Sequence, residues 1–326
     1  MDKICELYSE LQNRHSLKNN FTPVTELCLS KKFLLGISEN RTPMFLIDCK
    51  FENVVADLKL KFISILFNKN CKLIGDDNEE SLKVCSIIML NSESYDFQNY
   101  FLEVIYLLLQ NIPKNPSLKQ ISKEIDKIIA LFSHASKPTE KTVQGLWAEM
   151  FLISQSQNPE YMIKAWHCSP ESKFDFNDGT DKIEVKSTGK KERIHTFSLE
   201  QLNQNEHSGL IVASIFTTQT GIGKNISDLR SMIFSRISDI QIQTVFDSIV
   251  FKALGSDLEN AFDFCYDYQA AADTLRFFDS RAIPKIKDTD VPPEVSDVKF
   301  SCCLANVSSI PREALESSKS NLFRSL

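Results

Sequence analysis

The chain has 326 residues, 42% of them hydrophobic, and a formal net charge of −6, which allows two domains with ordinary cores and excludes the overall basic surface of a nonspecific nucleic-acid coat protein. It has no run of about 18 apolar residues, and its start lacks the basic and apolar regions of a signal peptide, so we expect a cytoplasmic protein without membrane contact. Nine cysteines without a Cys-x-x-Cys pair fit a reducing compartment and argue against a disulfide framework or a zinc ribbon.

Residues 1–93 predict a small antiparallel β-rich domain with a short helix at its start. Its β-prone runs are separated by Asn, Asp, Ser and Gly clusters, and lie at 33–37, 44–49, 58–67 and 84–90. Residues 94–138 predict a helical connector, with helices at 97–109 and 118–133.

Residues 139–223 predict the catalytic core. Apolar side chains from Val143 to Phe151 recur with helical spacing, which indicates an amphipathic helix over 140–156. The runs that follow predict an α-β-β-β-α-β order. Strands are expected at 161–167, in a hairpin over 172–187, and at 209–216. The run 194–197 is expected to extend the hairpin or to form a short return, and a helix is expected to start at Ser198.

Residues 224–326 predict a mostly helical carboxy-terminal region, with apolar periodicity at 229–237, 245–254 and 261–278 and a strand at 298–307. The expected fold class is therefore α/β (α+β), with a core between a β-rich domain and a helical region.

The hairpin over 172–187 holds the most informative residues. Asp178-Gly179 favours a two-residue type I′ turn, which pairs position 175 with 182 and position 173 with 184. Because side chains alternate along a strand, one face then carries Asp175, Lys182, Glu184 and Lys186, and the other carries Phe174, Phe176, Ile183 and Val185. Asp175 and Glu184 become diagonal neighbours, roughly 7–8 Å apart at Cα, within reach of one shared cation.

Two carboxylates and an ammonium group at this spacing are suited to binding Mg²⁺ and activating water against a phosphodiester. The plain alternative is an exposed hairpin face with a cross-strand Lys/Glu pair. The segment 182–193 also holds five basic and two acidic residues, which fits either a solvated loop or a phosphate-contacting one.

Asp175, the run Glu184-Val185-Lys186 and the expected order of elements resemble the PD-(D/E)XK nuclease superfamily, the fold of many restriction endonucleases. The surrounding residues, from the Gly145–Glu149 run through Trp166 and His195 to Gln201, are similar to bacterial PD-(D/E)XK motif proteins, which are often associated with restriction or phage-defence loci. The resemblance covers about residues 139–217. Phe174 stands where the motif has Pro, a position without a ligand role.

The resemblance implies that Asp175 and Glu184 bind Mg²⁺, or Mn²⁺ as a substitute, with the Val185 carbonyl as a further ligand. It implies that Lys186 orients or deprotonates the attacking water and offsets charge on the phosphate. Glu149 resembles the additional carboxylate that many members place near the metal.

Three of these residues keep simpler alternatives. For Glu149 the equal alternative is a carboxylate that only marks the edge of the apolar stripe of its helix. Gln201 resembles a polar residue that supports the catalytic lysine, but it also stands where its side chain can cap the helix that follows Ser198. His195 fits proton transfer or phosphate contact, and equally a packed, hydrogen-bonded histidine.

The sequence thus predicts a Mg²⁺-dependent DNA endonuclease of restriction or phage defence, acting as a homodimer or as a partner subunit of such a system. We expect the DNA contacts at Ser187, Thr188, Lys190, Lys191 and Arg193. The alternative is a catalytically inactive DNA-binding or scaffolding subunit of a defence or repair complex. A nuclease for RNA or branched DNA is a third possibility.

Overall fold

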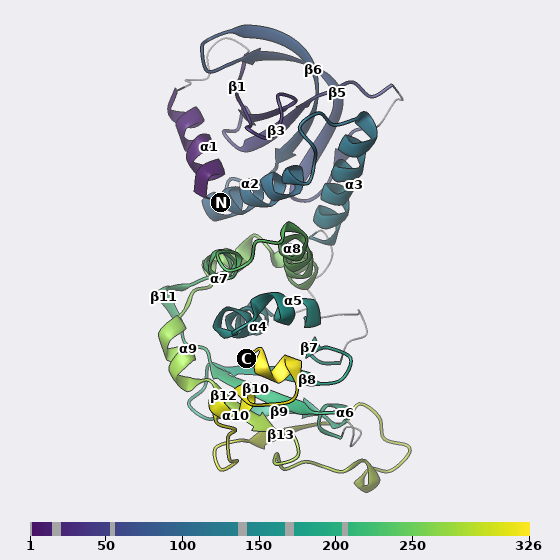
Figure 1. The fold of residues 1–326 in the computed structure, drawn as a ribbon, viewed down its shortest axis with the longest axis vertical. Coiled ribbons are helices and arrows are strands. Elements are labelled where there is room, and N and C mark those ends of the chain that lie inside the picture. Colours follow the sequence, from purple (N-terminus) through teal and green to yellow (C-terminus); the bar gives the residue numbers. More distant parts are fainter. Residues whose placement is uncertain (1, 15–20, 53–55, 136–141, 167–172, 204–207) are drawn as a thin grey trace. The chain divides into compact units, whose positions relative to one another are not determined.

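The computed structural model describes residues 2–14, 21–52, 56–135, 142–166, 173–203 and 208–326 (Figure 1). The chain divides into two compact units, one of residues 1–140 with 250–259 and one of residues 141–249 with 260–326. The predicted mixture of helices and sheets is confirmed. None of the helices in these ranges is long and apolar enough to cross a membrane.

The first unit is built on a sheet that closes on itself. Its strands are β1 (Thr22–Glu26), β2 (Phe33–Ile37), β3 (Pro43–Asp48), β4 (Leu58–Lys59), β5 (Ile63–Ile74) and β6 (Glu80–Leu90). They pair in the order β1-β2-β3-β6-β5-β4, and β1 also pairs with β5, so that five strands form a barrel-like ring. The pairing of β1 with β5 is parallel, and the prediction of a purely antiparallel domain is wrong in this respect.

The predicted strand over 58–67 is two strands. Leu60 N–H donates to the Ile63 carbonyl at 2.8 Å, which turns the chain between β4 and β5. The helices of this unit are α1 (Asp2–Arg14), α2 (Tyr95–Gln110) and α3 (Leu118–His134), which confirms the predicted helices. A capping box between Ser117 and Gln120 begins α3, as its sequence favours.

The second unit carries the predicted catalytic residues. Its elements before the carboxy-terminal region are α4 (Val143–Gln155), α5 (Pro159–Ala165), β7 (Phe176–Asn177), β8 (Lys182–Thr188), β9 (Ile194–Ser198), α6 (Leu199–Leu202) and β10 (Leu210–Phe216). The elements that follow are β11 (Gln219–Lys224), α7 (Ile226–Phe234), α8 (Ile240–Leu254), α9 (Tyr268–Thr274), β12 (Arg276–Asp279), β13 (Lys299–Cys303), α10 (Arg312–Glu316) and α11 (Asn321–Arg324). Residues 250–254 at the end of α8 belong to the first unit.

Helix α5 replaces the predicted strand over 161–167, so the order α-β-β-β-α-β is not confirmed. The Asn158 side chain accepts a hydrogen bond from Tyr161 N–H, and Pro159 occupies the first turn, which together start a helix. Likewise, the predicted helical run 261–278 ends in strand β12 instead. The predicted helix α4 and strand β10 are confirmed.

Four strands form the sheet that positions the site, in the order β12-β10-β8-β7. Strand β8 runs parallel to β10, and the other pairings are antiparallel. Lys186 pairs with Ser214, and Ser214 pairs with Arg276, so these three residues form one row across the sheet. Paired residues share a face, and Glu184, Val212 and Phe278 form the neighbouring row on that same face.

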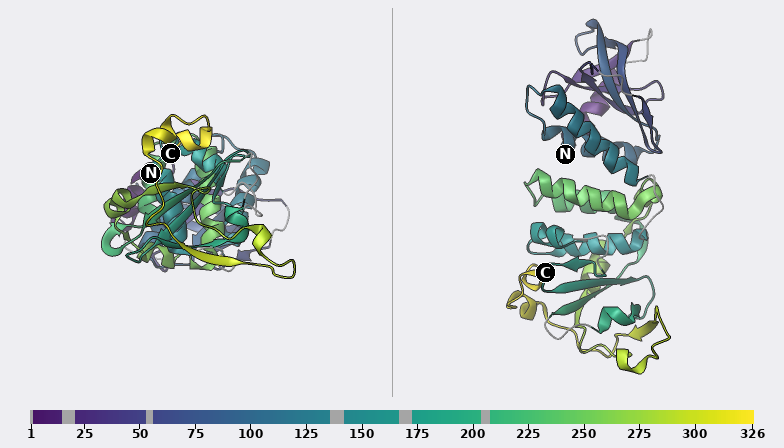
Figure 2. Two further views of the ribbon diagram at one scale, coloured as in Figure 1. Left: turned by 90° about the horizontal axis from the view of Figure 1, so that it is seen from below. Right: turned by 90° about the vertical axis from the view of Figure 1, so that its right-hand side faces the viewer.

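Helix α4 packs on β8, whereas β9 and β13 lie across the opposite face of the sheet (Figures 1 and 2). We had expected this segment to extend β8 or to form a short return. Strand β9 does neither. It pairs antiparallel with β13, with His195 opposite Cys302. The predicted strand over 298–307 is confirmed as β13, in which Cys302 is buried and Cys303 is exposed.

The predicted two-residue turn of the hairpin is wrong. Asn177 pairs with Lys182, so the loop has four residues, Asp178–Asp181. The Asp178 carboxylate accepts hydrogen bonds from Thr180 N–H (2.9 Å) and Asp181 N–H (2.8 Å), and this side-chain turn competes with the type I′ geometry. A type I′ turn needs two successive residues in the left-handed region, and in this loop only Gly179, with a φ of 92°, adopts it.

The longer loop shifts the register by two residues, which leaves the face of every β8 side chain unchanged. The recorded pairing ends at Phe176 and Ile183, so Asp175 lies just before the paired residues, and its diagonal position relative to Glu184 stays a prediction. The prediction for Phe174 is wrong, because it packs with Leu210 and Val212 on the Glu184 face. The chain is not a regular strand before β7, so alternation does not extend to it.

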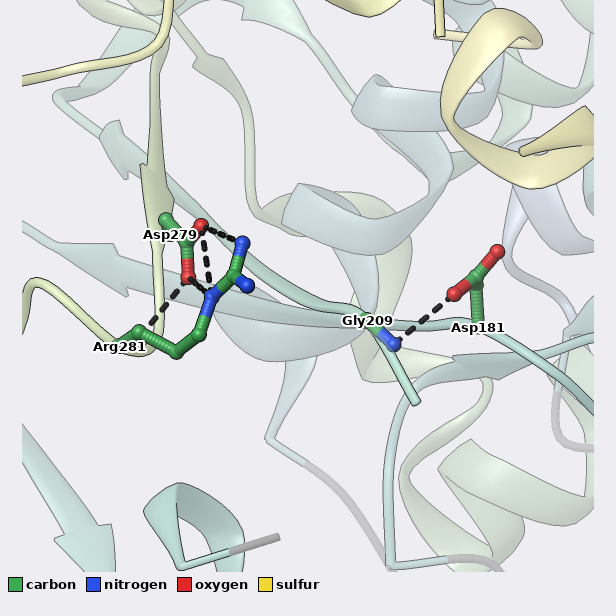
Figure 3. A network of polar contacts seen from close by, with 4 residues as sticks. All are labelled: Asp181, Gly209, Asp279 and Arg281. Atoms are coloured by element: carbon green, nitrogen blue, oxygen red, sulfur yellow. Dashed lines mark hydrogen bonds and ion pairs between the residues drawn. The ribbon is translucent and has the colours of Figure 1, made fainter. Parts of the chain in front are cut away.

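The start of β8 is tied to the start of β10. The Asp181 carboxylate accepts a hydrogen bond from Gly209 N–H at 2.9 Å (Figure 3). Lys182 N–H donates to the Gly209 carbonyl at 2.9 Å. A Cβ at position 209 would lie 2.7 Å from Asp181 Oδ1 and 2.9 Å from the Phe323 ring, so only glycine allows this close approach. These contacts set the parallel register of the two strands.

Helix α7 packs against α4 and is joined to α8 by a buried ion pair. Arg230 donates from Nε and Nη2 to both carboxylate oxygens of Asp247, at 2.7 and 2.8 Å, and both side chains are at most 2% exposed. The exposed pair of Arg281 and Asp279 offers a comparison on the surface of the same unit (Figure 3).

We expect Asp247→Ala to lower the free energy of unfolding by about 3–5 kcal/mol, because it leaves a buried guanidinium without its counter-ion. Arg281→Ala, which removes an exposed pair, should cost at most about 1 kcal/mol. Urea titrations followed by circular dichroism measure both. Equal losses in the two variants would contradict a buried, stability-determining pair.

Candidate active site

Asp175 is held against the middle of the sequence motif. Its carboxylate Oδ2 accepts a hydrogen bond from Val185 N–H at 2.8 Å, and Val185 stands between Glu184 and Lys186 on β8. A carboxylate that accepts a backbone N–H is fixed in orientation as well as position. The structure thus brings Asp175 to the strand that carries the other two residues.

Glu184 is a buried carboxylate, and two side chains contact one of its oxygens. It is 5% exposed, and its Oε1 lies 2.7 Å from Lys186 Nζ and 2.7 Å from Gln201 Nε2. A buried charge needs such compensation, because its transfer from water costs several kcal/mol. The Lys186 ammonium group also lies 5.2 Å from the centre of the Phe197 ring. The alternative of an exposed Lys/Glu pair is wrong for Glu184.

Gln201 makes both of the contacts that we had weighed against each other. Its Oε1 accepts from Ser198 N–H at 3.0 Å and so caps α6, while its Nε2 donates to Glu184. Lys186 Nζ lies 3.5 Å from the same Oε1. The cap therefore orients the amide so that its other end reaches the site.

Glu149 is 3% exposed, and its Oε2 accepts a hydrogen bond from the Trp166 indole at 2.7 Å. It comes from α4, the helix that packs on β8. Within the described ranges, no three His, Cys, Asp or Glu side chains gather into a group that could hold a metal ion. The assignment of Glu149 as an additional metal ligand stays a prediction.

His195 is 3% exposed, and its Nε2 lies 2.7 Å from Ser214 Oγ. The same hydroxyl accepts from Arg193 Nη1 at 2.7 Å. A guanidinium group only donates, so the Ser214 hydroxyl is an acceptor toward Arg193 and can still either donate to His195 Nε2 or accept from it. Burial, with the nearby charges of Lys186 and Arg193, lowers the pKa of His195 to about 4. His195 is therefore neutral at pH 7.

The residues that we expected to contact DNA differ in accessibility. Lys190 and Lys191 are exposed in the loop after β8. Thr188 is buried, and its hydroxyl accepts from Lys190 N–H, while Ser187 Oγ accepts from Gln144 Nε2 at 3.2 Å. Thus only the two lysines have fully exposed side chains.

Arg193 is turned into the protein. Its Nη1 donates to the Ser214 carbonyl at 2.9 Å, its Nη2 donates to the Thr274 carbonyl, and its guanidinium carbon lies 4.5 Å from the centre of the Phe216 ring. Burial and the nearby charge of Arg276 lower the pKa of Arg193.

Ser214 is the residue that sequence reasoning missed. It pairs with Lys186 across the strands and joins His195 to Arg193. The available signal was a hydroxyl side chain inside the apolar run Leu210–Phe216, since a buried polar group needs a hydrogen-bond partner.

The donor set of Asp175 and Glu184 fits a hard divalent cation. Mg²⁺ is commonly held by one or two carboxylates together with waters and phosphate oxygens. The two carboxylates are brought together on β8, which carries Glu184 and whose Val185 N–H holds Asp175. The residues present therefore suit Mg²⁺ without a third acidic side chain.

A family model described as "Putative PD-(D/E)XK family member, (DUF4420)" matches residues 5–305. Neither the curated proteins nor the solved structures contain a match to this chain.

The depressed pKa of His195 predicts a pH-dependent stability. Its neutral form is favoured in the folded state, so the contribution is complete above pH 6.5 and is lost as the pH falls toward 4. We expect the wild type to lose up to about 3 kcal/mol more than His195→Gln over this interval. Urea titrations at several pH values measure the difference, in which other titrating groups cancel. Parallel curves for the two proteins would refute it.

Proposed function

Because this chain belongs to DUF4420, whose family model carries the description "Putative PD-(D/E)XK family member", we propose that it is a Mg²⁺-dependent DNA endonuclease. The observation that carries the proposal is the buried Glu184–Lys186 pair, with Asp175 hydrogen-bonded to the residue between them. Two carboxylates beside a cation combine ligands for a metal with a positive charge for the reacting phosphate.

Asp175 and Glu184 would hold the Mg²⁺ ion, with the Val185 carbonyl as a further ligand. When bound, Mg²⁺ supplies Lewis-acid activation of the attacking water and of the phosphate. The hydrogen bond from Val185 N–H fixes Asp175 Oδ2, and the contact with Gln201 fixes Glu184 Oε1, so both carboxylates are oriented before any ligand arrives. Such preorganisation lowers the cost of assembling the site.

Lys186 would orient the attacking water and offset the negative charge that develops on the phosphate. Its ammonium group forms an ion pair with Glu184, and it must leave or share that contact to reach a substrate. While Lys186 contacts the substrate, Gln201 would keep Glu184 hydrogen-bonded, because its amide donates to Glu184 Oε1. Gln201 is thus a positioning residue.

The substrate that we propose is DNA, contacted first through the exposed Lys190 and Lys191. A role in restriction or phage defence follows the family resemblance. Cleavage of both strands of a duplex needs two sites, so we propose a homodimer or an assembly with a partner subunit.

The first test is cleavage of plasmid DNA with Mg²⁺. We expect Lys186→Gln to lower the rate at least about 100-fold, because it removes the charge and proton-transfer capacity of the lysine but keeps a donor for Glu184. Lys182→Gln is the matched control, since Lys182 lies four residues earlier on the same face of β8 and its Nζ contacts Ser208 Oγ. It should keep most of the activity.

Equal loss in both lysine variants would show that the strand as a whole had been disturbed. A wild type that cleaves no plasmid, alone or with a partner subunit, would contradict the proposal and favour a DNA-binding or scaffolding role. Parallel reactions with RNA and branched DNA identify the preferred substrate.

The second test is metal binding without nucleic acid, measured by calorimetry with Mn²⁺. We expect Asp175→Asn and Glu184→Gln to weaken binding at least about 10-fold, because each loses a charged oxygen ligand. Lys186→Gln should bind at least as tightly as the wild type. Glu149→Gln keeps an oxygen for the Trp166 indole and removes only the charge. We expect its affinity to be unchanged, and a large loss would place Glu149 in the metal site.

A further inference from the structure

A cavity of about 460 Å³ lies at the end of β10, beside β12 and β13. Basic, aromatic and aliphatic side chains line it from separate parts of the second unit. Those that matter for its chemistry are Lys191, Arg193, Phe216, Arg276, Phe278 and Leu304. Its volume falls within the range of about 300–1,000 Å³ that is usual for sites binding small ligands.

The sheet register sets this cavity on the face that carries Glu184 and Lys186. Arg276 is in the same row as Lys186, two strands away, which corresponds to roughly 10 Å between their Cα atoms. Phe278 is in the row of Glu184. The two sites thus share one sheet face but have separate sets of side chains.

Positive charge dominates the cavity. Lys191, Arg193 and Arg276 line it, and Glu192 is the acidic residue among the lining side chains. The guanidinium groups of Arg193 and Arg276 donate hydrogen bonds to carbonyl and hydroxyl oxygens, which do not neutralise their charge. Arg276 lowers the pKa of Arg193, in keeping with two like charges near each other. An anion between them would relieve this repulsion.

The remaining walls are apolar. Phe278 and Leu304 are buried, and Val307 is half-buried beside them. The Arg193 guanidinium is clamped by Ser214, Thr274 and the Phe216 ring, which makes it a fixed planar surface. Planar guanidinium groups and aromatic rings are the surfaces on which nucleic-acid bases stack.

We propose that this cavity binds one nucleotide, with its phosphate against Arg276 and Lys191 and its base against the Arg193 plane and the apolar wall. A nucleotide combines the negative charge and the flat apolar body that these walls match. It enters either as a free mononucleotide or as one residue of a substrate strand, and the second case rests on the nuclease function proposed above.

Cys303 provides a readout that does not require catalysis. It is exposed and lines the cavity, whereas Cys28 is an exposed cysteine of the first unit. The full chain is alkylated with N-ethylmaleimide in EDTA, and the rate at each cysteine is followed by mass spectrometry. The probes are thymidine 5′-monophosphate, thymidine, inorganic phosphate and a short oligothymidylate.

At ten times the dissociation constant, bound nucleotide should slow alkylation of Cys303 about 10-fold and leave Cys28 unchanged. Thymidine and inorganic phosphate should protect much less at the same concentration, because each lacks half of the contacts. If thymidine 5′-monophosphate protects Cys303, a free nucleotide is sufficient to occupy the cavity. If only the oligothymidylate protects Cys303, the occupant is one nucleotide of a substrate strand.

Arg276→Ala should raise the nucleotide concentration needed for half-maximal protection about 10-fold or more, as expected for a lost hydrogen bond to a charged group. Arg281→Ala removes an exposed arginine outside the cavity and should leave protection unchanged (Figure 3). Failure of both nucleotide probes to protect Cys303, or equal protection by inorganic phosphate, would overturn the proposal. Because EDTA removes divalent metal, neither result depends on whether the chain is a nuclease.

Discussion

The buried charge of Glu184 is the constraint on which the arrangement of the site depends. Its carboxylate lies on an interior sheet face, and Lys186 and Gln201 both direct polar hydrogens at one of its oxygens. The parallel pairing of β8 with β10 brings this residue beneath β9, and the short helix α6 brings the glutamine. These contacts compensate the burial of the carboxylate away from water.

Strand β9 explains why the site is enclosed. It leaves the hairpin, pairs with β13, and lies across the face that holds Glu184. From it, Phe197 covers the Lys186 ammonium group and His195 engages Ser214. The cavity beside Arg276 lies on the same sheet face as the Glu184 pair.

Several features were predictable because they depend on neighbours in the chain. The helix of residues 143–155 follows from its apolar period, and the face shared by Glu184 and Lys186 follows from strand alternation. That alternation survived the wrong turn because a shift of two residues preserves the faces. The predictions that failed locally did so where side-chain caps prevailed over β-propensity or turn preference, at Asn158 for α5 and at Asp178 for the hairpin loop.

The sequence by itself determined the chemistry that is available, two carboxylates and a lysine within 12 residues, from Asp175 to Lys186, together with their shared strand. Only the tertiary structure decided how those groups are used. It paired β9 with a strand about 100 residues later, joined Glu149 to Trp166, and turned Arg193 inward. Local steric rules act over a few residues, whereas these contacts join segments whose meeting depends on how the whole core packs.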